Sequence, residues 1–220
     1  MVSTFSISDV DPWENEYAII YLDHDPGLSA RYTIDRDVKR LIPIAIQHLS
    51  NAWHKLGDGY TMVDWVMPEK HKEPTPPGQL DWMRAEVLHQ RVLPPRAMAH
   101  EASEWVRGLG GNYWWTWRWV MGLLSVHRAL YGAEHPMAYM AFTLEVMPPV
   151  LLETASQQTE PPVQMQQEYK VETPDGLYIE CVDSWRNYYA KRRQRLLRWS
   201  GRTAPPWLVQ TESGWKLSRV

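Results

Sequence analysis

The sequence predicts a mainly α fold, with one compact helical domain over residues 1–208 and a C-terminal tail over residues 209–220. The stretch 110–132 carries four of the chain's 13 Trp and no proline or acidic residue. Its length between glycines suits a helix of about 30 Å. Residues 35–56 repeat apolar side chains at helical spacing. With 44% hydrophobic residues in 220, these segments can build one core around a central Trp-rich helix, with at most a short N-terminal strand or hairpin.

Composition restricts the class of protein. The net charge is −3, so the chain is not a polycation, and no apolar run approaches the 18 residues of a membrane span. Residues 1–17 lack the basic and apolar regions of a signal peptide. Cys181 is the single cysteine, so no internal disulfide forms and a reducing cytoplasm is expected. Trp and Tyr greatly outnumber the two Phe, which suits a core and also a surface that stacks bases.

The N-terminal part begins with an apolar run, Tyr17–Leu22, that predicts a short strand or a buried extended segment. Asp23 or Asp25 then caps a helix that starts at Pro26. A helix is predicted from Asp35 to about Leu56, with a kink or a late start at Pro43.

The remaining segments follow from turn residues and periodicity. A loop is predicted over 57–78, with a short strand at 60–67, and helices are predicted over 80–93, 97–109 and 110–131. A further helix follows Pro136 and runs to about Met147, and a Pro- and Gln-rich arm over 148–174 then wraps the surface. The last helix runs from about Ile179 to Ser200 and stops at Gly201. Gly110 and Gly111 allow another backbone to approach closely.

Two helices carry polar rows opposite their apolar faces. One row, bordered by Asp35, contains Arg36, Arg40, Gln47 and His54. This row is either a solvated helix face or a binding site for an anion.

The other row contains His100, Glu104 and Arg107. It is either a surface ion cluster or a base with its carboxylate and an anion clamp. On the central helix, Asn112, Arg118 or His127 is expected to reach a pocket at one end.

A basic segment ends the last predicted helix. Lys191, Arg195, Arg198 and Arg202 recur at helical spacing, Arg192 lies beside them, and no acidic residue interrupts them. The segment is either a solvated face or a patch for phosphate backbones. The chain has no P-loop, GxGxxG, GxSxG, HExxH or CxxC motif, so no organic cofactor or structural zinc is expected, and a weak magnesium site of carboxylates stays open.

Three blocks together resemble a widespread set of helical bacteriophage proteins. The first comprises Leu22-Asp23-His24-Asp25-Pro26 and a helix with Asp35-Arg36-Asp37-Val38-Lys39-Arg40, Gln47 and Ala52-Trp53-His54. The second comprises His100, Trp105, Arg107, Asn112-Tyr113, Trp115, Tyr131-Gly132 and His135. The third comprises Glu168-Tyr169-Lys170, Trp185-Arg186-Asn187-Tyr188-Tyr189, Trp199, Arg202, Pro205 and Trp207. Two positions depart: the family's His is Asp37 here, and a helical Glu is Ile44.

One branch of that set resembles the amino acid:DNA transferases of thymidine hypermodification, related to alpha-glutamyl/putrescinyl thymidine pyrophosphorylases. The resemblance implies a transferase in the cytoplasm of an infected bacterium. It would join the amine of a free amino acid to the C5 methylene of 5-(pyro)phosphomethyl-deoxyuridine in double-stranded DNA. Glycine is the first candidate for the amino acid. A non-catalytic DNA-binding protein and a DNA glycosylase-like enzyme are the alternatives.

That chemistry requires a base for the amine and cations for the anionic groups. The residues expected to supply the base are Asp35, His100 and His54. Those expected to hold the substrates are Arg36, Arg40, Gln47, Arg107, Asn112, Tyr113 and Arg186. Those expected on DNA phosphates are Lys191, Arg192, Arg195, Arg198 and Arg202. No metal ligand is assigned.

Overall fold

The computed structural model describes residues 18–57 and 92–218. The predicted loop over 57–78, its strand and the helix over 80–93 lie almost wholly outside the described residues. The described helices are α1 (Pro26–Tyr32), α2 (Asp35–Leu56), α5 (Glu101–Gly108), α6 (Gly110–Tyr131), α7 (Ala138–Thr143) and α8 (Cys181–Arg192), with 3-10 turns η3 (Pro149–Thr154), η4 (Gln167–Tyr169) and η5 (Gln194–Leu196). The strands form two antiparallel pairs, β1 (Val171–Glu172) with β2 (Ile179–Glu180) and β3 (Leu208–Thr211) with β4 (Gly214–Leu217).

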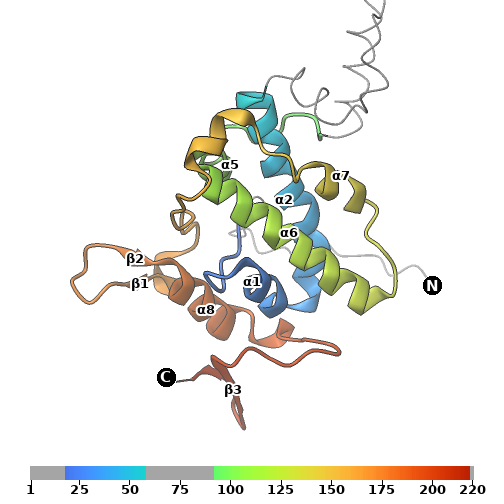
Figure 1. Cartoon of the computed structure of the whole chain (residues 1–220). Coiled ribbons are helices and arrows are strands. Elements are labelled where there is room, and N and C mark those ends of the chain that lie inside the picture. Colours follow the sequence, from blue (N-terminus) through green and yellow to red (C-terminus); the bar gives the residue numbers. More distant parts are fainter. Residues whose placement is uncertain (1–17, 58–91, 219–220) are drawn as a thin grey trace, which may run out of the picture.

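Helix α6 is the centre of the domain, as predicted. It crosses α2 and packs against α1 and α5 (Figure 1). Trp119, Val120 and Leu123 on this helix are fully buried. The helix ends at Gly132, which adopts a left-handed conformation with φ 67° and donates its N–H to the carbonyl of Arg128. A glycine there avoids the steric cost that a Cβ would add. The mainly α prediction is confirmed.

Helix α2 has the predicted bounds and continues through Pro43. The helix therefore does not start late, although proline removes one backbone donor from its interior. Its apolar side chains pack into the core, and Leu41, Ala45 and Leu49 are fully buried. The sequence pattern was sufficient here because the apolar stripe is long and regular.

The N-terminal apolar run forms a buried extended segment over residues 18–22 rather than a strand. The Ser29 hydroxyl on α1 satisfies part of its backbone. It accepts the N–H of Leu22 at 3.0 Å and donates to the carbonyl of Ile20 at 3.2 Å. A serine on α1 thus replaces the neighbouring strand that such a backbone would otherwise need.

The last predicted helix is too long by eight residues, since α8 ends at Arg192 rather than at Ser200. Arg193 turns inward to Asp37, and the Trp199 indole donates to the carbonyl of Tyr32 at 2.8 Å. These long-range contacts outweigh the local helical pattern. Gly201, predicted to stop the helix, instead takes a left-handed turn with φ 68°.

The predicted tail over 209–220 is also corrected, because most of it belongs to the β3–β4 hairpin. Trp215 on β4 packs edge-to-face against Trp199, with ring centroids 5.7 Å apart. Gln194 donates to the carbonyl of Trp215 at 3.2 Å. The hairpin therefore lies on the segment that follows α8 and is part of the domain.

The helices predicted around the central one are shorter than expected. Helix α5 begins at Glu101 rather than near Ala97, and α7 ends at Thr143 rather than near Met147. The arm over 148–174 contains η3 and η4 and runs past the N-terminal end of α6 (Figure 1). No described helix is long and apolar enough to cross a membrane.

Candidate functional site

Asp35 and His100 do not lie close together. Asp35 is the first residue of α2, whereas His100 lies beside His48, with ring centroids 6.0 Å apart. Thirteen residues separate Asp35 from His48, which corresponds to about 20 Å along a helix. Asp35 and His100, both expected to supply the base, therefore do not belong to one site.

Asp35 is engaged in the structure of the C-terminal segment. Its carboxylate pairs with Arg202 at 2.6 Å and accepts the N–H of Ser200 at 2.9 Å. Burial opposes ionisation, but the bonds from Ser200 and Arg202 outweigh it and hold the pKa of Asp35 below its usual value. A carboxylate with a lowered pKa and two partners is a poor base for an amine.

His100 is the N-cap of α5. Its Nδ1 accepts the N–H of Ala102 at 3.2 Å, so that nitrogen carries no proton. Burial lowers the pKa of His100, and Glu101 opposes this only in part. The side chain thus has a structural role at a helix terminus.

The polar residues midway along α2 hold the segment that precedes α5. Gln47 donates to the carbonyl of Pro94 at 2.9 Å, and Asn51 donates to the carbonyl of Arg96 at 2.7 Å. The exposed His54 lies 2.7 Å from the carbonyl oxygen of Leu93. Gln47 and His54 therefore order a loop, and neither lines the described pocket.

Three further predicted substrate residues are tied to backbone groups. Arg107 donates to the carbonyl of Met98 at 2.6 Å, and Tyr113, fully buried, donates to the carbonyl of Leu144 at 2.8 Å. Asn112 accepts the N–H of Thr159 at 2.9 Å. Their donors and acceptors maintain the packing of α5, α6 and the arm, so the assignment of these three to substrate is corrected.

At the start of α2, Arg36 is exposed and Arg40 lies 3.5 Å from Asp37. Neither arginine lines the described pocket. The two therefore stay predictions as ligands of an anion, at a place away from the pocket.

The basic segment is divided by the early end of α8. The side chain of Arg202 is 9% exposed and bonds to Asp35 and to the carbonyls of Arg31 and Thr33, so its assignment to DNA is corrected. Lys191, Arg192, Arg195 and Arg198 are exposed, but only the first two lie on α8, and Arg195 lies on the short 3-10 turn η5.

One residue from each of the second and third blocks of the resemblance meets the first block at the turn over residues 22–26. From α8, Arg186 pairs with Asp23 at 3.2 Å and donates to the carbonyl of Leu22 at 3.1 Å. From α6, the Trp115 indole donates to the carbonyl of His24 at 2.8 Å. These contacts join residues separated by 91 and 164 positions.

The arm reaches the same turn. Glu160 lies 3.6 Å from Nδ1 of His24, and Gln158 donates to the Tyr21 hydroxyl at 3.1 Å. His24 is exposed, with 71% of its side chain accessible. A histidine beside a carboxylate is a suitable acceptor of a proton from an amine.

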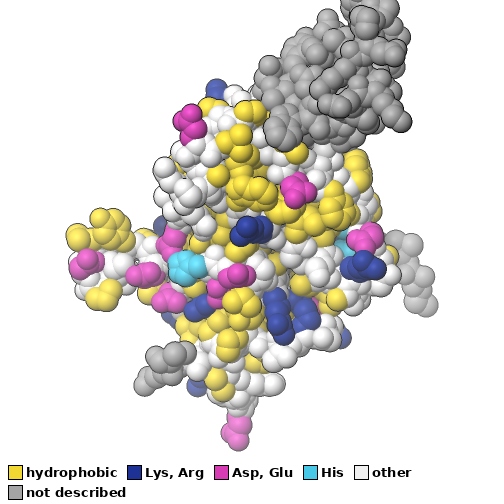
Figure 2. Space-filling model, in the orientation of Figure 1, with side chains coloured by type: hydrophobic (Ala, Val, Ile, Leu, Met, Phe, Trp, Pro, Cys, Tyr) yellow, Lys and Arg dark blue, Asp and Glu magenta, His cyan; other side chains and the backbone are white. Residues whose placement is uncertain are grey.

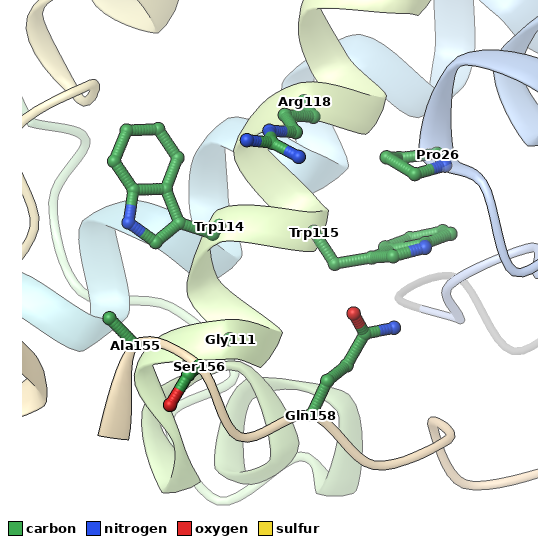
Figure 3. A pocket seen from close by; sticks show the side chains of 8 residues that line it. All are labelled: Pro26, Gly111, Trp114, Trp115, Arg118, Ala155, Ser156 and Gln158. Atoms are coloured by element: carbon green, nitrogen blue, oxygen red, sulfur yellow. The ribbon is translucent and has the colours of Figure 1, made fainter.

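A pocket of about 270 Å³ adjoins this turn and is lined by Pro26, Gly111, Trp114, Trp115, Arg118, Ala155, Ser156 and Gln158. Figure 3 shows the two indole rings on opposite sides of α6, with Arg118 between them at one end and Gln158 at the other. Trp115 is buried, Trp114 is half-buried, and Arg118 is exposed. The Arg118 guanidinium lies 5.8 Å from the Trp114 ring centroid.

Two glycines position the wall of the pocket that the arm forms. A Cβ on Gly110 would overlap the carbonyl oxygen of Leu151, and one on Gly111 would overlap that of Gln157. Gly110 also donates its N–H to the Thr154 hydroxyl at 2.8 Å. The expected close backbone approach is thus observed, and it brings Ser156 and Gln158 against α6.

Sequence reasoning identified only part of this pocket. Arg118 was one of three residues expected at a pocket, whereas Asn112 and His127 do not line it. Trp114, Ser156 and Gln158 were missed. The Gly110-Gly111 pair was the available signal, because it marks the place where the arm touches the helix.

Cys181 is buried, and burial raises the pKa of its thiol, so it is unsuited to covalent attack. In the described part of the chain, no group of three or more His, Cys, Asp or Glu side chains is arranged to hold a metal ion.

Comparisons of the chain with protein-family models, curated proteins and solved structures find no match. The class of the protein is therefore described by its structure alone. It is a mainly α domain with a pocket lined by Trp and Arg side chains.

Proposed function

We propose that the protein is a DNA-modifying transferase of the amino acid:DNA type, acting in the cytoplasm of an infected bacterium. It joins a free amino acid, with glycine as the first candidate, to 5-(pyro)phosphomethyl-deoxyuridine in double-stranded DNA. The convergence of the three blocks at the turn over residues 22–26 carries the proposal. Packing alone does not require the motif residues Asp23, His24, Trp115 and Arg186 to gather beside a pocket.

The reaction forms a bond between the amine nitrogen and the C5 methylene carbon. The bond from that carbon to the phosphate oxygen breaks, and (pyro)phosphate leaves with its electron pair. The ammonium proton must first go to a base, and His24 beside Glu160 replaces Asp35 and His100 in that role. Arg118 supports the departing or incoming anion, since a guanidinium binds phosphate or carboxylate through paired hydrogen bonds. Magnesium assistance stays an alternative.

Incubation of the protein with pyrophosphorylated DNA and glycine is expected to yield a thymidine whose C5 methylene carries the glycine nitrogen, detected by mass spectrometry of the nucleosides. His24→Ala should lower the rate about 10²–10⁴-fold, as for loss of a general base, and leave DNA affinity nearly unchanged. His54→Ala is the matched control, because His54 is also exposed but lies at the far end of α2. Release of a free base would indicate a glycosylase-like enzyme, and equal losses in the two variants would reject His24.

Exposed cations at the end of α8 and directly after it favour a second candidate, a non-catalytic DNA-binding protein. Replacing Lys191, Arg195 and Arg198 by Ala should weaken binding to all DNA sequences alike. Each lost phosphate contact makes the negative slope of log K against log salt shallower by about 0.9. Binding isotherms at several salt concentrations measure this slope. Arg128→Ala is the control, because Arg128 is equally exposed and pairs with Glu134. An unchanged slope in the triple variant would show that the segment is only solvated.

A further inference from the structure

The pocket on α6 has the chemistry of a site for one nucleotide. Its walls are the indoles of Trp114 and Trp115, and its polar groups come from Arg118, Ser156 and Gln158. Pockets for drug-sized ligands measure about 300–1,000 Å³. At about 270 Å³, this one suits a smaller molecule, with one ring system and a charged substituent.

The ring system would lie against Trp114. That indole is half-buried and packs edge-to-face on Trp117, with ring centroids 5.1 Å apart, so its position is held by a neighbour. A base that stacks on this indole would lie beside the Arg118 guanidinium, and stacking of a base on an aromatic side chain contributes substantially to binding. Trp115 is less available, because it is 2% exposed and its ring lies 4.6 Å from that of Tyr21.

The charged substituent would lie at Arg118. Within residues 18–57 and 92–218, this arginine has no carboxylate partner, and its guanidinium lies over the Trp114 ring. Figure 2 shows hydrophobic side chains gathered over α6, with basic and acidic side chains among them. A guanidinium beside an aromatic platform fits a ring that carries a phosphate.

The side-chain amide of Gln158 would bind an edge of the ring by a hydrogen bond. Gln158 uses its amide N–H on the Tyr21 hydroxyl, which leaves its carbonyl oxygen as an acceptor. Figure 3 shows that oxygen pointing toward the space between the two tryptophans. Amide side chains recognise base edges through such groups. A ligand that has a carboxylate but no ring N–H would leave the Gln158 carbonyl oxygen without a ring donor.

We infer that the pocket lined by Trp114, Arg118 and Gln158 binds a single pyrimidine nucleotide, free or as a residue of a nucleic acid strand, with its phosphate on Arg118. The inference stands on the pocket and not on the proposed transfer reaction. Retained nucleotide binding with a failed transfer assay would overturn only the latter.

Calorimetric titration of the full chain with dTMP tests the inference. Arg118→Ala should weaken dTMP binding about ten- to hundred-fold and leave thymidine, which lacks the phosphate, nearly unaffected. Trp114→Ala should weaken both ligands about ten-fold. Arg128→Ala, an exposed arginine on the same helix, is the matched control and should bind dTMP normally.

If Trp114→Ala unfolds, Trp114→Phe keeps a ring at that position, and the exposed Arg118 still tests the site. Arg118-dependent binding of dTMP alone supports a free nucleotide. Tighter Arg118-dependent binding of oligothymidylate supports a nucleotide within a strand. Absence of dTMP binding at millimolar concentration would overturn the inference, as would equal binding of inorganic phosphate or equal losses in the Arg118 and Arg128 variants.

Discussion

Replacing Asp37 by Ala is expected to lower the free energy of unfolding by about 3–5 kcal/mol, the usual cost of breaking a buried ion pair by removing one partner. Asp37 is 1% exposed and Arg193 is 5% exposed, and their side chains approach to 3.3 Å. The Tyr189 hydroxyl donates to the same carboxylate at 3.3 Å. Without Asp37, the Arg193 charge would lose its carboxylate at the contact between α2 and α8.

Denaturant unfolding measures this effect. Asp183→Ala is the matched control, because Asp183 is 61% exposed and lies 3.9 Å from Arg186. It should cost less than about 1 kcal/mol, as exposed pairs do. Joint replacement of Asp37 and Arg193 by Leu and Met should recover much of the loss, since both charges are then gone. A loss below about 1 kcal/mol in Asp37→Ala would contradict the role of the pair.

Replacing Gly111 by Ala is the second large effect that we expect. The new Cβ would lie 2.6 Å from the carbonyl carbon of Gln157 and closer still to its oxygen. Both atoms belong to backbone, so either the arm or α6 must move. Overpacking of this kind costs about 1–3 kcal/mol. The movement also displaces Ser156 and Gln158, so dTMP binding should fall together with stability.

Gly108→Ala is a close control for this change. Gly108 also lies in a helix, the last turn of α5, but a Cβ there would meet nothing within 4 Å. The substitution should be neutral or stabilising by up to about 1 kcal/mol, from helix propensity alone. Denaturant unfolding and calorimetric titration of both variants separate the effect of helix propensity from the effect of the contact between α6 and the arm. If Gly111→Ala were as stable as Gly108→Ala and bound dTMP equally, the arm would not depend on this glycine.

Asp37 also shows what a departure from a pattern can mean. Asp37 stands where the resemblance in the sequence would place His, which suggested only that a role of that side chain was altered. The structure gives the aspartate a buried arginine partner 156 residues away. Ile44, the other departure, is a buried core residue of α2. Both departures therefore serve packing in this chain.

The candidate site was less predictable than the fold. Asp35, His100, Gln47 and Arg107 were chosen because they lie opposite apolar faces. Each one bonds instead to a backbone group, distant in sequence for Asp35 and Gln47 and nearby for His100 and Arg107. Helical periodicity places a side chain on a face, but it cannot show which carbonyl that face meets. The polar rows thus indicated where loops are held, not where a substrate binds.

The sequence by itself determined the helical class, the bounds of α2 and the span of α6, because a long apolar stripe and flanking glycines act within one helix. Only the tertiary structure decided that α8 ends at Arg192, that the tail is a hairpin, and that a pocket lies beside Trp114. The end of α8 and the pocket depend on contacts between residues far apart in the chain, and the hairpin packs on Trp199. Their free energy, from burial and from satisfied polar groups, exceeds the local preferences that a sequence pattern expresses.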